Sequence, residues 1–279
     1  MGSRHRYSTQ APRGAAGGGN RVSGIAEDTQ PVAFRSRVLG NRLLASLPAD
    51  DRSTLERAGE VVRLDRGMVL CDIGQDVHST FFPGAGTVAS FVLLLRDGRT
   101  VEAATIGCEG AIGGIVSSGH KPAFARAEVQ IGGAALRVPI ERLEELKSTS
   151  FALRDVFTRY ADFLLAQVMQ SVACNAFHAL EARCCRWLLT TRDRVGADDI
   201  RLTQESLAEM LGVQRTTVSS IARSLQSQGL ISYSRGLIRM LDRDGVRAVA
   251  CECYENVEAH FAAVLPELVR PARIVDLKR

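Results

Sequence analysis

Apolar positions in the first part of the chain change from a helical to an alternating spacing near residue 60. Residues 38–60 place four leucines on one helical face, and Pro48 lies where a second helix could begin. From 61 to 139, short apolar runs are separated by glycine and proline, as in a series of strands. The pattern predicts an antiparallel β-barrel or β-roll, in which Asp97-Gly98 forms a two-residue hairpin turn.

The spacing returns to a helical period at Ile140, and one or two long helices are expected within 151–190. Their apolar stripe consists of Phe157, Tyr160, Ala161, Leu164, Val168 and Val172, broadened by Phe163, Leu165 and Met169. A stripe this wide can pack against the protein's own β-roll and against a second copy of the helix. It is therefore a candidate dimer interface, with an ordinary core helix of a monomer as the alternative.

Residues 202–231 have the pattern of two short helices joined by a tight turn. Thr203 is placed as an N-cap, and Glu205 lies in the first turn, where the helix dipole favours an acidic side chain. Gly212 can adopt the left-handed conformation that ends the first helix. The second helix starts near Arg215, and its apolar residues recur at the spacing of one buried face.

The outward-facing residues of this second helix are polar or basic, as in a helix that enters the major groove of DNA. The segment 230–241 is then predicted to form two strands joined by a tight turn, which is a wing whose arginines would lie near phosphates. The candidate DNA-binding residues are Gln214, Arg215, Thr216, Thr217, Ser219, Ser220 and Arg223 on the helix, and Arg235 and Arg239 on the wing. A helical hairpin used only for packing is the alternative, and the wing argues against it.

Charge and composition limit the function without deciding it. The net charge of +4 and the pI near 8.8 permit a nucleic-acid partner. Residues 199–241 carry five arginines against three acidic residues, so a ligand-sensing or scaffold protein that does not bind DNA stays open. An enzyme is a third class, but no catalytic constellation stands out and no catalytic residue is assigned.

The seven cysteines are scattered, which argues against the disulfide framework of a secreted protein. No CxxC motif occurs, and Cys184-Cys185 and Cys251-Glu252-Cys253 are too tight for the common zinc spacings. We therefore predict buried or half-buried free thiols in a reducing cytosol and no metal site, with a redox or metal-sensing role as the alternative.

The chain divides into four predicted parts: a disordered basic tail (1–35), a sensor β-roll (38–147), a dimerisation helix region (151–194) and a DNA-binding domain (195–265). The longest apolar run, 88–95, is too short to span a bilayer. The N-terminus also lacks an apolar signal core. We expect a soluble, cytoplasmic protein with no membrane partner.

The segment 203–219, Thr-Gln-Glu-x-Leu-Ala-x-x-Leu-Gly-Val-x-Arg-x-x-Val-Ser, resembles the C-terminal domain of the Crp/Fnr family of bacterial regulators. Gly-Leu-Ile at 229–231, Arg-Gly-x-Ile at 235–238 and the helix at 180–189 are similar as well. The resemblance implies an α+β fold with a cyclic-nucleotide-binding-like β-roll, a long dimerisation helix and a winged helix-turn-helix. It further implies a homodimer that reads a palindrome in double-stranded DNA, with RNA polymerase as a further candidate partner.

The sensor part departs from the pattern of well-known relatives. Members that bind cyclic AMP hold the ribose with a glutamate and the cyclic phosphate with a following arginine. Gly114 stands where that glutamate would be, whereas Arg126 matches the arginine. The candidate effector site is Gly113, Gly114 and Arg126, with the effector unknown and cyclic AMP disfavoured, because its buried ribose hydroxyl would lack a charged acceptor. A purely structural role for Arg126 is the alternative.

Two further departures concern the cofactor and the DNA sequence. Iron–sulfur members use cysteines near the N-terminus, and no cysteine precedes Cys71, so that cofactor is not expected. Nothing in the sequence supports haem. Thr216 and Ser220 stand where many relatives carry glutamate and arginine, so we expect a different DNA consensus.

Overall fold

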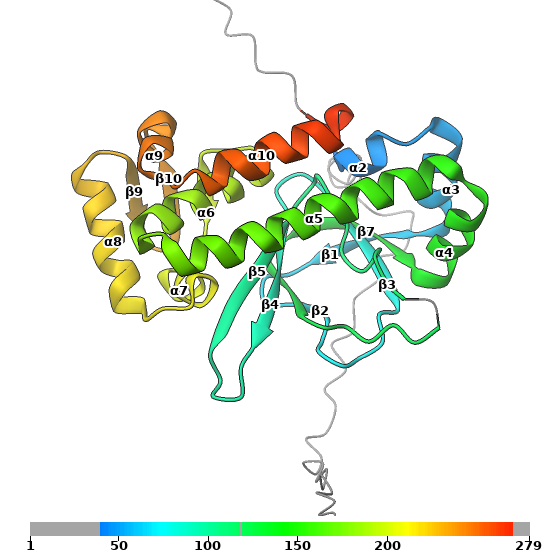
Figure 1. The fold of residues 1–279 in the computed structure, drawn as a ribbon, viewed down its shortest axis with the longest axis horizontal. Coiled ribbons are helices and arrows are strands. Elements are labelled where there is room, and N and C mark those ends of the chain that lie inside the picture. Colours follow the sequence, from blue (N-terminus) through cyan, green and yellow to red (C-terminus); the bar gives the residue numbers. More distant parts are fainter. Residues whose placement is uncertain (1–39, 118, 270–279) are drawn as a thin grey trace, which may run out of the picture.

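The computed structural model describes residues 40–117 and 119–269, and the predicted tail at 1–35 lies outside them. The described chain forms a β-roll, a long helix that crosses it, and a smaller C-terminal unit at one end (Figure 1). This arrangement confirms the predicted α+β class. Among the described helices, none combines the length and apolar character needed to cross a membrane.

Two antiparallel sheets form the roll. One has the order β1 (Glu60–Leu64), β7 (Gly133–Pro139), β3 (Ser79–Pro83). The other has the order β2 (Val69–Cys71), β6 (Arg126–Ile131), β4 (Val88–Leu94), β5 (Thr100–Ile106). Side chains from both sheets, including Val62, Phe81 and Val129, are buried in one cluster. Helices α2 (Arg42–Ala45) and α3 (Ala49–Ala58) precede the roll, as the leucine pattern predicts.

The turn between β4 and β5 differs from the predicted two-residue hairpin. Leu95 N–H donates to the Arg99 carbonyl at 2.8 Å, and Gly98 N–H donates to the Leu95 carbonyl at 3.0 Å. The loop therefore contains Arg96, Asp97 and Gly98. A two-residue type I′ turn needs positive φ at both central residues, but only Gly98 has it, at +83°. The three-residue loop needs just one such position.

Helix α4 (Ile140–Thr149) leads into α5 (Phe151–Phe177), the long helix that lies across the roll in Figure 1. Tyr160 is fully buried, and its hydroxyl donates to the Ala111 carbonyl at 3.0 Å, which ties α5 to the roll. A second face of α5 carries Phe163, whose ring packs 4.8 Å from that of Phe261. The predicted stripe therefore divides between the roll, the C-terminal helix and the surface.

The chain turns at His178 and continues as α6 (Leu180–Val195), so the expected helical region contains two helices. Beyond it lie β8 (Asp199–Arg201), α7 (Gln204–Leu211), α8 (Arg215–Ser227), β9 (Ile231–Ser234) and β10 (Leu237–Met240). Strand β8 was not predicted, and it joins the wing as a third strand in the order β8-β10-β9.

The last helical stretch is also two helices, α9 (Arg243–Val249) and α10 (Cys253–Val264), followed by a 3-10 turn at Pro266–Leu268. Helix α10 packs along α5, so the end of the described chain returns to the long helix (Figure 1). Helix α6 shares one hydrophobic core with α7, α8 and the wing.

Candidate nucleic-acid interface

Helices α7 and α8 form the predicted helix-turn-helix. The Thr203 hydroxyl accepts from Ser206 N–H at 3.2 Å and caps α7. Gly212 ends α7 with φ of +68°, in the left-handed conformation that its position requires. Val218 and Leu225 bury one face of α8, at 1% and 0% exposure. The opposite face of α8 is consequently left to solvent.

That outer face carries most of the predicted DNA-binding residues. The exposed residues are Gln214, Arg215, Thr216, Thr217, Ser220 and Arg223. In the part of the chain that the structure describes, Arg215 and Arg223 form no ion pair with a carboxylate, and Arg223 Nε donates to the Ser219 carbonyl at 3.3 Å. The first three turns of α8 thus present uncompensated positive charge beside short hydroxyl side chains.

Ser219 is placed differently from the other predicted residues. It is only half-buried, and its hydroxyl lies 2.6 Å from Gln204 Oε1 and 3.0 Å from the Arg215 carbonyl. The contact with Gln204 bridges α8 to the start of α7. Ser219 therefore helps to fix the angle between the two helices.

The two predicted arginines of the wing have different surroundings. Arg235 and Gly236 have φ of +47° and +77°, the two positive values of a type I′ turn, so the exposed Arg235 lies at the tip. Arg239 instead makes two hydrogen bonds to Asp199 on β8, at 2.6 and 2.9 Å. That pairing lowers the pKa of the Asp199 carboxyl and largely compensates the charge of Arg239.

Several polar contacts hold the DNA-reading unit, which comprises residues 180–249, against the β-roll. Arg66 donates to the Thr203 hydroxyl at 3.0 Å. Trp187 Nε1 donates to both carboxylate oxygens of Glu102, each at 3.1 Å. Arg194 and Glu109 form an ion pair at 2.7 Å with both side chains 4% exposed. The orientation of the reading unit relative to the roll is therefore fixed by specific polar pairs, of which Arg194–Glu109 is buried.

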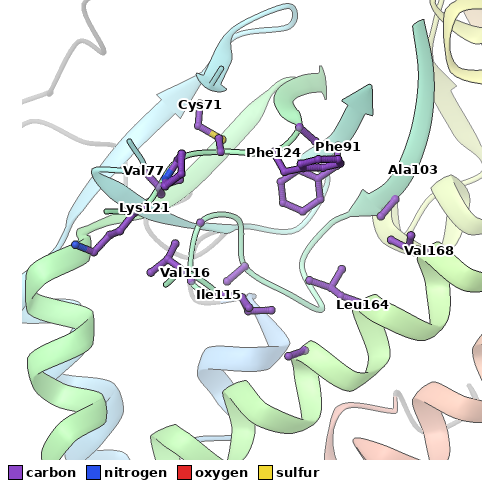
Figure 2. Close-up of a pocket in the computed structure, with 18 of the residues that line it drawn as sticks. Cys71, Val77, Phe91, Ala103, Ile115, Val116, Lys121, Phe124, Leu164 and Val168 are labelled. Carbon is purple, nitrogen blue, oxygen red and sulfur yellow. The ribbon is translucent and has the colours of Figure 1, made fainter. Parts of the chain in front are cut away.

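A cavity of about 650 Å³ lies between the roll and α5. Figure 2 shows apolar side chains around it, with Phe91 and Val77 on the roll side and Leu164 and Val168 on α5. The predicted Gly113 and Gly114 line this cavity, but Arg126 is not among its lining residues.

Arg126 is engaged elsewhere. Its Nε and one terminal nitrogen donate to Asp72 at 3.0 and 2.9 Å, and this pairing lowers the pKa of the Asp72 carboxyl. Of the three predicted effector residues, the structure brings two to the cavity, and it gives the third a structural partner on the neighbouring strand end.

Packing explains why glycine occupies position 114. A Cβ atom built there would lie 2.2 Å from Cε1 of Phe157 on α5. Gly113 has φ of +85°, and its Cβ would lie 2.5 Å from the Ser79 carbonyl oxygen. Neither position can hold a carboxylate without displacement of α5 or of the loop.

The structure also gathers a group of residues that the sequence analysis missed. Side chains of Cys174, His178, Cys251 and Cys253 lie together where α5 meets the start of α10. The cysteines are buried or half-buried as predicted, since six are buried and Cys71 is half-buried. Motif spacing could not reveal the group, because its two pairs are more than 70 residues apart in sequence. The one available signal was His178, four residues after Cys174 on the same helical face.

Comparison with known proteins agrees with this geometry. Residues 182–249 match the family of Crp-like helix-turn-helix domains. This region is a Crp-like helix-turn-helix domain. No curated protein matched the chain in sequence.

Solved structures extend the agreement to the remainder of the fold. FixK2 from Bradyrhizobium japonicum is 19% identical with a TM-score of 0.59, covering 69% of this chain and 98% of its own. The c-di-GMP-responsive regulator CLP of Xanthomonas campestris is 16% identical with a TM-score of 0.57, covering 69% and 99%. TTHB099, a CRP-family transcriptional regulator from Thermus thermophilus, is 19% identical with a TM-score of 0.57, covering 67% and 95%. The resemblance to the Crp/Fnr regulators is confirmed, and the chain has their fold.

Proposed function

We propose that this chain is a sequence-specific transcription regulator that binds double-stranded DNA as a homodimer and has no enzymatic activity. The observation that carries the proposal is the outer face of α8, where Arg215 and Arg223 are exposed and lack carboxylate partners among the described residues. This face begins at the helix N-terminus, which is the part of a recognition helix that contacts base edges. Arg235 at the wing tip is placed to contact the phosphate backbone.

A bare apolar face on α5 supports the dimer. Leu165, Met169 and Val172 are 58%, 62% and 66% exposed, whereas other faces of the helix pack on the roll and on α10. Their spacing of four and three residues places them in one row. Pairing of two such rows around a two-fold axis would bury them and present two α8 helices to successive major grooves, ~34 Å apart.

The cavity supports an effector-sensing role for the roll. Its walls are mainly apolar, and α5 contributes Ala161, Leu164, Leu165 and Val168. Leu165 thus borders both the cavity and the proposed dimer face. An effector bound here would contact α5, the helix whose pairing sets the separation of the two α8 helices in the proposed dimer. It would shift the DNA affinity if it favoured one arrangement of the two subunits. The lining favours a largely apolar molecule over a cyclic nucleotide.

The test is selection of bound duplexes from a random pool by the full-length protein at moderate salt, followed by affinity measurements on the enriched site. We expect a palindrome, with dissociation constants that rise steeply with salt. Arg215→Ala should weaken binding by about 5- to 150-fold and relax one position of each half-site, since a bidentate arginine–guanine contact contributes ~1–3 kcal/mol. Arg57→Ala, an exposed arginine on α3, is the matched control. A folded dimer that enriches no sequence would instead favour the sensor or scaffold alternative.

A further inference from the structure

Four side chains at the junction of α5 and α10 carry the donor atoms of a metal site. Cys174 lies in the last turn of α5, and His178 is the residue at which that helix ends. Cys251 precedes α10, and Cys253 is its first residue. The three sulfur atoms and one imidazole nitrogen all lie within 4.8 Å of one another.

We propose that Cys174, His178, Cys251 and Cys253 bind a zinc ion in a tetrahedral Cys₃His site. Cys174 Sγ lies 3.5 Å from Cys251 Sγ, and Cys253 Sγ lies 3.3 Å from His178 Nδ1. Zinc bonds of about 2.3 Å to sulfur and about 2.0 Å to nitrogen place tetrahedral donors roughly 3.5–3.8 Å apart. The Cys174–Cys251 sulfur separation is thus near the edge length of a zinc tetrahedron and well beyond the ~2.05 Å of a disulfide.

Burial gives the site the closed character of a structural zinc centre. Cys174 and Cys253 are fully buried, and Cys251 is 8% exposed. Together they form a small cluster separate from the three larger hydrophobic cores. Four protein ligands leave no open coordination position, so the site suits a structural ion and not a catalytic one.

His178 is oriented as a ligand by its neighbour Glu252. The imidazole turns Nδ1 toward Cys253, while Nε2 lies 3.1 Å from Glu252 Oε1. A carboxylate on Nε2 holds the proton there and leaves the Nδ1 lone pair for the metal, as in the carboxylate–histidine–zinc arrangement. Glu252 stands between the two cysteines, so one tripeptide supplies two thiolates and the outer carboxylate.

Two side chains outside the four ligands act on the sulfur atoms. Gln170 Nε2 donates to Cys253 Sγ at 3.0 Å, and the Arg186 guanidinium interacts electrostatically with Cys174. Because cysteine binds zinc as a thiolate, the metal displaces the thiol protons on binding.

Two arginines of α6 more than offset the negative charge of the occupied site. Three thiolates and one zinc ion carry a net charge of −1. Arg183 and Arg186 both interact electrostatically with Cys174, and the Nε atom of each is buried without a hydrogen-bond partner. In the described part of the chain, neither arginine forms an ion pair with a carboxylate, which leaves both charges for the thiolates.

The test is metal analysis of the full-length protein prepared without chelator and dialysed against trace zinc. We expect about one zinc per chain, and replacement by Co²⁺ should give the intense visible bands of a tetrahedral thiolate site. Cys174→Ser and Cys253→Ser should each lose the bound zinc. Cys71→Ser, on a half-buried cysteine outside the cluster, should keep it.

A milder variant keeps the test independent of folding defects. Glu252→Gln leaves every ligand in place on a side chain that is 67% exposed, and it should weaken zinc binding by about 10- to 100-fold in competition with a chelating dye. The proposal is overturned if the folded, fully reduced protein takes up neither zinc nor Co²⁺. A Cys174–Cys251 disulfide in the protein isolated under air would overturn it in favour of a redox pair.

Discussion

Gly114 carries a packing constraint that can be measured directly. Its missing side chain makes room for the ring of Phe157, which a Cβ atom would approach to 2.2 Å. Gly114→Ala should therefore lower the free energy of unfolding by about 1–3 kcal/mol, the usual cost of overpacking, in urea titrations. Phe157→Leu also destabilises, but the two losses should not add in the double variant, because the smaller side chain relieves the clash. Strict additivity would show that the two positions do not touch.

The two arginines of the wing differ in whether a carboxylate compensates their charge. Among the described residues, no carboxylate pairs with Arg235 at the wing tip, whereas Arg239 is held by Asp199. Arg235→Ala should reduce the slope of log affinity against log salt by about 1, the loss of one phosphate contact. Arg239→Ala should change the slope less, because its charge is already balanced. Fluorescence anisotropy on one duplex at several salt concentrations measures both, and equal slopes would contradict this difference.

Residues that act on their own backbone were predictable from the sequence. Thr203 caps a helix, and Gly212 takes positive φ, because the chemistry of one residue decides each outcome. Arg126 was not predictable in the same way. Its partner, Asp72, is 54 residues away in sequence. No local pattern shows that this ion pair holds the Arg126 guanidinium outside the cavity lining.

At the scale of elements, the apolar row on α5 makes the dimer testable. Met169→Glu places a charge in the middle of the row, and burying it unpaired should weaken dimerisation by at least ~100-fold. Analytical ultracentrifugation over a range of concentrations measures this. Leu241→Glu, on an exposed apolar residue of the reading unit, should leave the dimer intact. If both variants or neither dissociate, the dimer uses another surface.

Most strands and helices follow the apolar periodicity of the sequence. The sequence predictions fail where a contact with another element decides the local structure. Strand β8 is three residues long and exists because β10 offers it a free edge, which no local pattern reveals. The β4–β5 loop was predicted from Asp97-Gly98, a dipeptide that serves both two- and three-residue hairpins. The final helical stretch breaks before α10, at the cysteines that the metal proposal joins to α5.

Contacts that join distant parts of the chain could not be predicted from the sequence at all. Trp187 with Glu102, and Arg194 with Glu109, each connect residues 85 positions apart. These pairs fix the reading unit against the roll. The cysteine cluster likewise connects α5 with α10 beside the turn at His178, where the long helix gives way to the Crp-like domain. We therefore expect a ligand that stiffens this junction to affect the orientation of α7 and α8.

Removal of zinc should therefore affect both stability and DNA binding. A ligand at 1,000 times its dissociation constant stabilises the folded state by about 4 kcal/mol, so chelation of the full-length protein should lower its melting temperature by several degrees. DNA affinity should fall as well, because α10 and α5 would no longer be fixed beside the start of α6. Zinc but not Mg²⁺ should restore both, and Cys71→Ser should behave like the unaltered protein. If chelation lowers the melting temperature and leaves DNA affinity unchanged, the ion only stabilises the fold, and the junction does not control the orientation of α8.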